Sequence, residues 1–160
     1  MTAGGHLRRV EGDSLLRILD GVSHTPADRD PVADDHLYLD TDWQALDYLV
    51  SGEYSEEPLA WAVRGRYRSR VDLEGADTRS RIGPADVQRV AAALLELSEA
   101  AVTGRCDPQK LDQLGLNPGY RERTDEGGRV RERLRDRFLE IREFYRVAAE
   151  RRMGVIAWQL

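Results

Sequence analysis

The spacing of apolar residues divides the chain into helical and extended segments. In the last third, large apolar side chains recur at intervals of three and four residues and therefore share one face of a long helix. That face consists of Val130, Leu134, Phe138, Ile141, Tyr145 and Ala148. A second long helix, opened by Gly83-Pro84, is expected to have its own apolar face. It consists of Val87, Val90, Leu94, Leu97 and Ala101.

Extended segments are expected near both ends of the chain and in its middle. Residues 6–10 have the pattern of a short strand, and residues 66–73 alternate with a period of two, with a return strand at 78–82. The last segment, 155–160, is apolar on both faces, which is typical of a central strand, so Val155, Ile156 and Trp158 should be among the most buried residues. We therefore expect a helix-rich α+β fold, a single domain over 1–160, with a small central sheet that includes the C-terminal strand.

A short helix in the second quarter of the chain has the clearest local boundaries. Thr41 and Gln44 have the spacing of a capping box, in which each side chain bonds the backbone amide of the other residue. The carboxylates of Asp40 and Asp42 would lie beside the positive end of the helix dipole. Gly52 is placed to end this helix with a positive φ. The sequence thus predicts Thr41 as the N-cap.

Two further short helices are expected to begin at prolines. Pro58 is placed at the first position of one helix, which Gly65 would end. Asp107 precedes Pro108 and can cap the other helix, which Gly115 would end. In both helices a proline, which cannot donate a backbone hydrogen bond, stands at the start, and a glycine, which readily adopts a positive φ, stands at the end.

Four short motifs follow one another along the chain. They are Leu39-Asp40-Thr41-Asp42-Trp43, Pro58-Leu59 with Gly65, Pro84-Ala85-Asp86-Val87, and Asp107-Pro108 followed by Asn117-Pro118-Gly119. Their order and spacing resemble those of the YfbM-like family, a bacterial domain of unknown function. The resemblance covers nearly the whole chain and implies one domain of that family, for which no activity is established.

The chain departs from the family pattern at two places. It begins Met1-Thr2-Ala3-Gly4-Gly5, where family members usually open with a Met-Gly-Met-Ile-type strand. Tyr48 stands where a histidine is common in the family. A role that depends on that histidine therefore does not transfer to this chain.

The composition is that of a globular, highly charged protein. Of the 160 residues, 41% are hydrophobic and 33% are charged, and no apolar run approaches the ~20 residues that a membrane span needs. The start shows no basic-then-apolar leader, and the single cysteine, Cys106, offers no disulfide framework. We therefore expect a soluble cytoplasmic protein that does not interact with membranes.

Acidic residues are concentrated in one third of the chain. Residues 11–57 contain thirteen Asp and Glu against two Arg, a net charge of −11, whereas the whole chain has −5. An acidic region of this kind can be an interaction face for a basic partner. It can also fold against the basic remainder of the chain, which is the interpretation we favour. In that case its carboxylates should lie near arginines, especially those within 64–70 and 129–146.

The acidic region supplies the first group of candidate ligand- or partner-binding residues: Asp34, Asp35, His36, Asp40 and Asp42. Carboxylate oxygens suit Ca²⁺ and Mg²⁺, but the glycine and closing glutamate of a calcium loop do not fit this segment, so no metal site is expected. His36 with Asp34 or Asp35 is a candidate acid–base pair. No Gly-x-Ser-x-Gly motif accompanies it, and no catalytic residue is assigned.

The second group of candidate binding residues is Arg66, Arg68 and Arg70. If residues 66–71 form a strand, these three arginines share one face and can clamp phosphates or carboxylates. The alternative is an exposed sheet face on which charge prevents aggregation. An isoelectric point near 5.3 argues against a nucleic-acid partner.

These observations favour an uncharacterised binding or interaction module of the cytoplasm that is not an enzyme and needs no cofactor. Two alternatives remain open. The first is an acidic, immunity-like protein that covers a basic partner protein through residues 11–57. The second is a small hydrolase that uses His36 and the neighbouring aspartates. A protein partner fits both the binding module and the immunity-like protein.

Overall fold

The computed structural model describes residues 4–11, 35–68, 79–116 and 127–159. Its strands are β1 (Gly5–Val10), β2 (His36–Asp40), β3 (Tyr67–Arg68), β4 (Ser80–Ile82) and β5 (Gly154–Gln159). Its helices are α2 (Trp43–Ser51), α3 (Trp61–Arg64), α4 (Pro84–Glu96), α5 (Glu99–Arg105), α6 (Pro108–Gln113) and α7 (Gly127–Glu150). The predicted α+β class, rich in helix and with a small sheet, is confirmed.

The five strands form one antiparallel sheet in the order β2-β1-β5-β4-β3. The C-terminal strand β5 lies at the centre, with β1 on one side and β4 on the other. Val155 and Ala157 belong to the main core, whereas Ile156 packs with Val10 on the opposite face. The prediction of a central strand with apolar residues on both faces is therefore confirmed.

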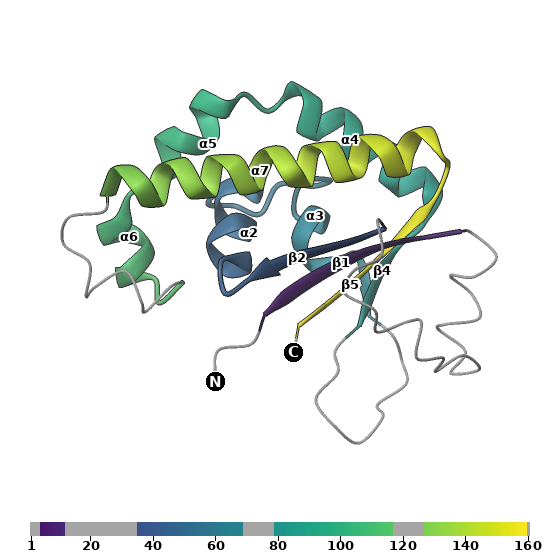
Figure 1. Ribbon diagram of the computed structural model, residues 1–160, viewed down its shortest axis with the longest axis horizontal. Coiled ribbons are helices and arrows are strands. Elements are labelled where there is room, and N and C mark those ends of the chain that lie inside the picture. Colours follow the sequence, from purple (N-terminus) through teal and green to yellow (C-terminus); the bar gives the residue numbers. More distant parts are fainter. Residues whose placement is uncertain (1–3, 12–34, 69–78, 117–126, 160) are drawn as a thin grey trace, which may run out of the picture.

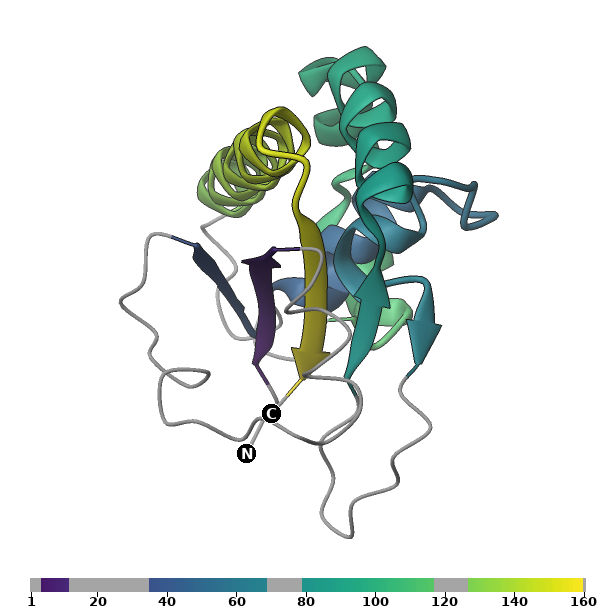
Figure 2. The same cartoon turned by 90° about the vertical axis from the view of Figure 1, so that its right-hand side faces the viewer.

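The helices lie on one side of this sheet (Figures 1 and 2). The long helix α7 packs against α4, α5 and α2 and also touches the edge strand β2. Helices α3 and α4 contact the central strand β5. This arrangement encloses one continuous core between the helices and the sheet. Among the described residues, no helix combines the length and the apolar character needed to cross a membrane.

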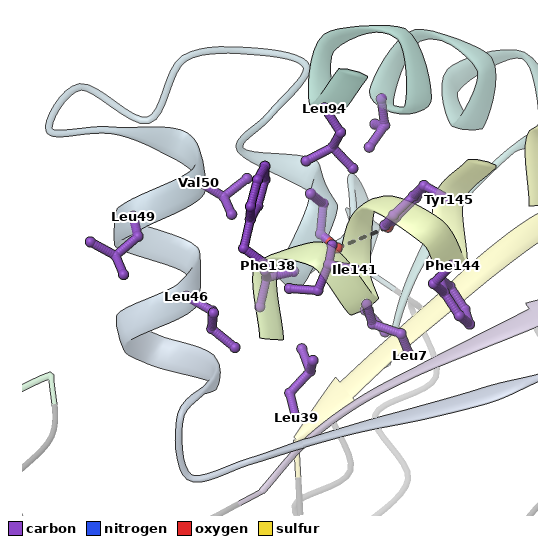
Figure 3. Close-up of a cluster of buried hydrophobic side chains, with 14 of the residues drawn as sticks. Leu7, Leu39, Leu46, Leu49, Val50, Leu94, Phe138, Ile141, Phe144 and Tyr145 are labelled. Carbon is purple, nitrogen blue, oxygen red and sulfur yellow. Dashed lines mark hydrogen bonds between the residues drawn. The ribbon is translucent and has the colours of Figure 1, made fainter. Parts of the chain in front are cut away.

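The apolar face of α7 forms the middle of the core (Figure 3). All six residues predicted for that face are buried. They belong to the same cluster as Leu7, Leu39, Leu46, Val50 and Leu94 of the sheet, α2 and α4. The Tyr145 hydroxyl donates a hydrogen bond of 2.9 Å to the backbone carbonyl of Ala62 in α3. Complete burial raises the pKa of Tyr145 above its usual value, so the hydroxyl stays a donor.

The second predicted long helix is divided into two. Helix α4 ends at Glu96, and the backbone is extended at Leu97, where ψ is 113°. The Ser98 hydroxyl then accepts a hydrogen bond of 3.1 Å from the amide of Ala101 and caps α5. The apolar period continues across the break, which is why the sequence pattern alone joined the two helices.

Two other local predictions need correction. Helix α3 begins at Trp61 and not at Pro58, because residues 57–60 form turns before it. Gly65 ends this helix with a φ of 76°, as expected. Trp158 was expected among the buried residues of the terminal strand, but it is only partly buried and lies on the sheet face opposite the helices.

The predicted capping box at Thr41 does not form. Asp40 has a φ of 53°, and its carboxylate accepts a hydrogen bond of 2.8 Å from the Thr41 amide, so the chain turns sharply between β2 and α2. Asp42 occupies the N-cap position but makes no side-chain cap bond. Its carboxylate instead accepts from Arg133 of α7 at 2.9 Å. A tertiary ion pair has therefore replaced the local cap.

This difference predicts unequal effects for two neighbouring substitutions. Thr41→Ala should change the free energy of unfolding by no more than about 0.5 kcal/mol, because the hydroxyl caps nothing. Asp42→Ala should destabilise by about 1 kcal/mol or more, because it removes a buried, charge-assisted hydrogen bond. Urea denaturation of both variants measures the difference. A larger loss at Thr41 than at Asp42 would restore the capping box.

Candidate functional site

The structure places Asp35 and Asp42 of the acidic region in ion pairs with arginines from distant segments. An oxygen of Asp35 lies 3.1 Å from Nε of Arg9 and 3.6 Å from Nη1 of Arg151. Asp42, with a side chain only 7% exposed, pairs with Arg133 at 2.9 Å. Both aspartates therefore have structural roles, and Asp34 lies outside the described residues.

Two more carboxylates of this region also lie near basic groups. Asp47 in α2 lies 2.7 Å from Nε of Arg64, and Glu53 lies 4.0 Å from Nζ of Lys110. Burial raises the pKa of Asp47, although the Arg64 guanidinium opposes that shift. Arg64 and the Arg133 partner of Asp42 come from the two segments, 64–70 and 129–146, named above as the source of neutralising charge.

Asp40 has a turn-forming role. Besides the Thr41 amide, its carboxylate accepts a hydrogen bond of 3.2 Å from the Tyr38 hydroxyl. This bond and the nearby negative charge of Asp40 add to desolvation, the main cause of the raised Tyr38 pKa. The Asp40 carboxylate therefore stabilises the left-handed turn that connects β2 to α2.

His36 belongs to a cluster of aromatic rings on the sheet face opposite the helices. The rings come from three adjacent strands: His36 and Tyr38 from β2, His6 from β1 and Trp158 from β5. The His6 ring is nearly parallel to Trp158, with centroids 5.0 Å apart. Nδ1 of His6 and Nε2 of His36 lie 3.0 Å apart, a hydrogen-bonding distance. His36 thus contacts His6, whereas Asp35, one of its two candidate acid–base partners, bonds Arg9 and Arg151.

The positions of His36 and Asp35 give little support to a metal site or a hydrolase site. Asp35 points to Arg9 and Arg151, away from the His36 ring contacts, because neighbouring residues near a strand alternate in direction. Across the described part of the chain, no group of three or more His, Cys, Asp or Glu side chains is arranged to hold a metal ion. The two histidines alone would give a metal too few ligands.

Of the three candidate arginines, Arg66 lies in a well-defined cluster. Its guanidinium carbon is 4.2 Å from the centroid of the Trp61 ring and 4.7 Å from that of Tyr67. Arg89 approaches the same Trp61 ring at 5.0 Å, and Arg81 approaches Tyr67 at 5.7 Å. Only the backbone of Arg68 is described, and Arg70 lies outside the described residues.

We call Arg66, Arg81 and Arg89, with Trp61, Tyr67 and Asp86, the arginine cluster. Asp86 bonds two of its guanidiniums, that of Arg66 at 2.6 Å and that of Arg89 at 3.3 Å. The hydrogen bond that Arg66 donates to Asp86 is the main reason why the pKa of Arg66 is raised. Within the described segments Arg81 forms no ion pair. The cluster thus contains three cations, two of which bond Asp86, and the charge of Glu57 also acts on Arg66, so positive charge remains in excess.

Four elements assemble this cluster, α3, β3, β4 and α4, together with the link between α3 and β3 that carries Arg66. Gly65 has a φ of 76°, and a Cβ there would lie 2.5 Å from the Ser80 side chain, so only glycine allows the chain to approach β4 so closely. The next residue, Arg66, donates its backbone amide to the Arg81 carbonyl at 3.1 Å. Tyr67 then lies opposite Arg81 in the β3–β4 ladder. Asp86 and Arg89 come from the first turns of α4.

The comparison with protein families classifies the whole chain. A model of a domain of unknown function, DUF1877, matches residues 6–158. Because this match spans nearly all of the sequence, the chain belongs to the DUF1877 family. No curated protein matches the chain.

Among solved structures, the chain is similar to the crystal structure of YfbM, a protein of unknown function from Escherichia coli. The superposition covers 98% of this chain and 99% of that chain, with a TM-score of 0.72 and 13% sequence identity. The likeness at this identity concerns the fold. The YfbM-like resemblance seen in the sequence motifs is confirmed.

The arginine cluster makes a spectroscopic prediction. Arg66 helps to cover Trp61, which is only 5% exposed. Arg66→Ala should expose this ring and shift its fluorescence to longer wavelength, because the guanidinium and its alkyl stem are both removed. The Trp61 contribution is obtained by subtracting the spectrum of a Trp61→Phe variant. Arg135→Ala, whose ion pair is with the adjacent Asp136, serves as the control, and an equal shift there would contradict the assignment.

Proposed function

We propose that this protein is a binding module of the cytoplasm that recognises carboxylate groups on a partner protein through the arginine cluster. The observation that supports this proposal is the charge balance of the cluster, in which Asp86 is the only carboxylate bonded to Arg66 and Arg89 among the described residues. In a chain with a net charge of −5, a local excess of arginine offers a specific site for anions.

The aromatic rings favour a protein partner over a freely diffusing ion. Trp61 and Tyr67 hold the Arg66 guanidinium by its faces, which leaves the edges of that group to donate hydrogen bonds. Tyr67 is 46% exposed and adds an apolar surface beside these donors. Tryptophan, tyrosine and arginine are the residues that most often dominate the energy of protein interfaces.

The acidic region gives less support to a basic partner. In its described part, Asp35, Asp42 and Asp47 already bond arginines of the same chain. A partner would have to displace these ion pairs before it could use the carboxylates. The immunity-like alternative therefore depends on other acidic residues of this region, among them the exposed Glu11, Glu56 and Glu57 and those within 12–34, which lie outside the described residues.

Enzymatic function has less support than binding. The pKa of the Cys106 thiol is raised, chiefly by burial, so the thiol is a weak nucleophile at neutral pH. His36 contacts His6, and Asp35 contacts Arg9, so the His36–Asp35 form of the acid–base pair is divided between two sites. The other form needs Asp34, which lies outside the described residues. A catalytic role for His36 predicts an activity that disappears in His36→Ala.

The proposal is tested by affinity capture from native lysate. The wild-type chain should retain a partner at low salt and release it at high salt, because a charged interface is screened. Arg81→Gln with Arg89→Gln should weaken the purified complex by about tenfold or more, the effect of losing charge-assisted hydrogen bonds.

Matched controls distinguish this interface from general charge effects. Arg135→Gln with Arg137→Gln removes the same charge from α7, where both arginines pair with residues of the same helix, and it should leave the complex intact. Asp35→Asn should also have little effect. Equal weakening by both arginine pairs, or loss of the complex in Asp35→Asn alone, would contradict the proposed site.

A further inference from the structure

A separate pocket of about 360 Å³ lies where the end of α2 meets the junction of α5 and α6. It is lined by Tyr48, Glu53, Gly104, Arg105, Asp107 and Lys110. None of these residues belongs to the arginine cluster. The volume lies at the lower end of the range for small-molecule sites in proteins.

Backbone turns and helix ends fix the charged groups around this pocket. The Arg105 Nη1 atom donates to the carbonyls of Leu49 and Val50, at 2.8 and 3.3 Å, and so satisfies the end of α2. Gly52 adopts a φ of 76° immediately afterwards and leads the chain to Glu53. The Asp107 carboxylate accepts from the Gln109 amide at 3.0 Å and caps α6.

Lys110 is the centre of the pocket's chemistry. It is the only lysine in the chain, against 23 arginines. Its ammonium lies 5.8 Å from the centroid of the Tyr48 ring and 4.0 Å from the Glu53 carboxylate. A hydrogen bond to Tyr48, followed by the charge of Glu53, raises the pKa of Lys110, so the side chain is a cation at neutral pH.

The pocket contains charges of both signs that are not tightly paired. The distance of 4.0 Å between Lys110 and Glu53 is longer than a direct charged hydrogen bond, and their side chains are 44% and 64% exposed. Arg105 uses Nη1 for the α2 carbonyls. Its Nε and Nη2 atoms form no other hydrogen bond within the described segments, so they can donate to a ligand. Two cations and two carboxylates therefore converge on one small space.

We propose that this pocket binds a small zwitterion of the α-amino-acid class. Lys110 and Arg105 would hold the carboxylate of the ligand, and Glu53 and Asp107 would hold its ammonium group. A ligand with only one of these charges would leave two of the pocket charges without a partner. The pocket should therefore bind a zwitterion more tightly than a ligand with one charge, because leaving buried polar groups unpaired costs binding free energy.

Gly104 gives a second indication that the pocket is kept open. It lies within α5, where glycine is about 1 kcal/mol less favourable than alanine. Apart from its chain neighbours and the backbone of its own helix, a Cβ at this position would meet no atom of the described residues within 4 Å, and its φ is not positive, so neither packing nor backbone conformation requires glycine. A side chain here would instead occupy space at the pocket wall.

The binding test uses the full chain and individual L-α-amino acids as probes. Reductive methylation with ¹³C-formaldehyde labels one lysine, Lys110, besides the α-amino group of Met1. The Lys110 methyl signal should shift in a saturable way with at least one amino acid at concentrations up to about 10 mM. The matching amine without a carboxylate, and the matching acid without an amine, should produce no saturable shift. Equal binding of either analogue would overturn the zwitterion assignment.

Calorimetry on unlabelled variants connects the binding to this pocket. Lys110→Met and Glu53→Gln should each reduce affinity by about tenfold or more, and Lys110→Arg should retain part of it. Gly104→Ala should raise the melting temperature and weaken binding, a combination that unfolding cannot produce. Arg81→Gln should leave amino-acid binding unchanged, because Arg81 does not line this pocket. The pocket proposal and the arginine-cluster proposal can therefore fail separately. If no amino acid binds, or if Lys110→Met binds like wild type, the pocket proposal is wrong.

Discussion

The fold depends on the central position of β5, which pairs with strands on both sides and directly follows the longest helix. Arg152 has a φ of 52° at the turn between α7 and β5, so the chain reverses within a few residues. The helix consequently lies back over the sheet to which its own C-terminal strand belongs. Phe138, Ile141 and Tyr145 are then buried against the strands and α2. One short connection thus brings the apolar face of α7 over the apolar face of the sheet.

The other elements are held against this unit by a few specific contacts between distant residues. The Tyr145 hydroxyl joins α7 to α3, and the Arg133–Asp42 pair joins α7 to the start of α2. Arg105 joins α5 to the end of α2. These contacts satisfy backbone or charged groups that would otherwise be unpaired near the core. They also place the arginine cluster and the Lys110 pocket in separate regions of the molecule.

In the folded chain, several carboxylates of the acidic region form ion pairs with arginines from distant segments. The sequence concentrates acidic residues in 11–57, which we expected to fold against the basic remainder, and Asp35, Asp42 and Asp47 bond arginines that are 17 to 116 residues away. The sites proposed for recognition are the arginines around Trp61 and Tyr67 and the mixed charges around Lys110. Binding specificity in this domain is therefore proposed to arise from small charged sites and not from net charge.

The sequence by itself determined the elements whose signals are local: the apolar face of α7, the Asp107 cap of α6 and the apolar character of β5. It also supported the family resemblance, through the order of its motifs. Only the tertiary structure decided that Asp42 pairs with Arg133 while Thr41 caps nothing, and that His36 contacts His6. The sequence also did not predict the arginine cluster, since Arg66 lies in the link between α3 and β3, Arg81 in β4 and Arg89 in α4. Periodicity and capping depend on neighbours within a few residues, whereas these contacts depend on strand register and helix packing, which bring distant residues together only in the folded chain.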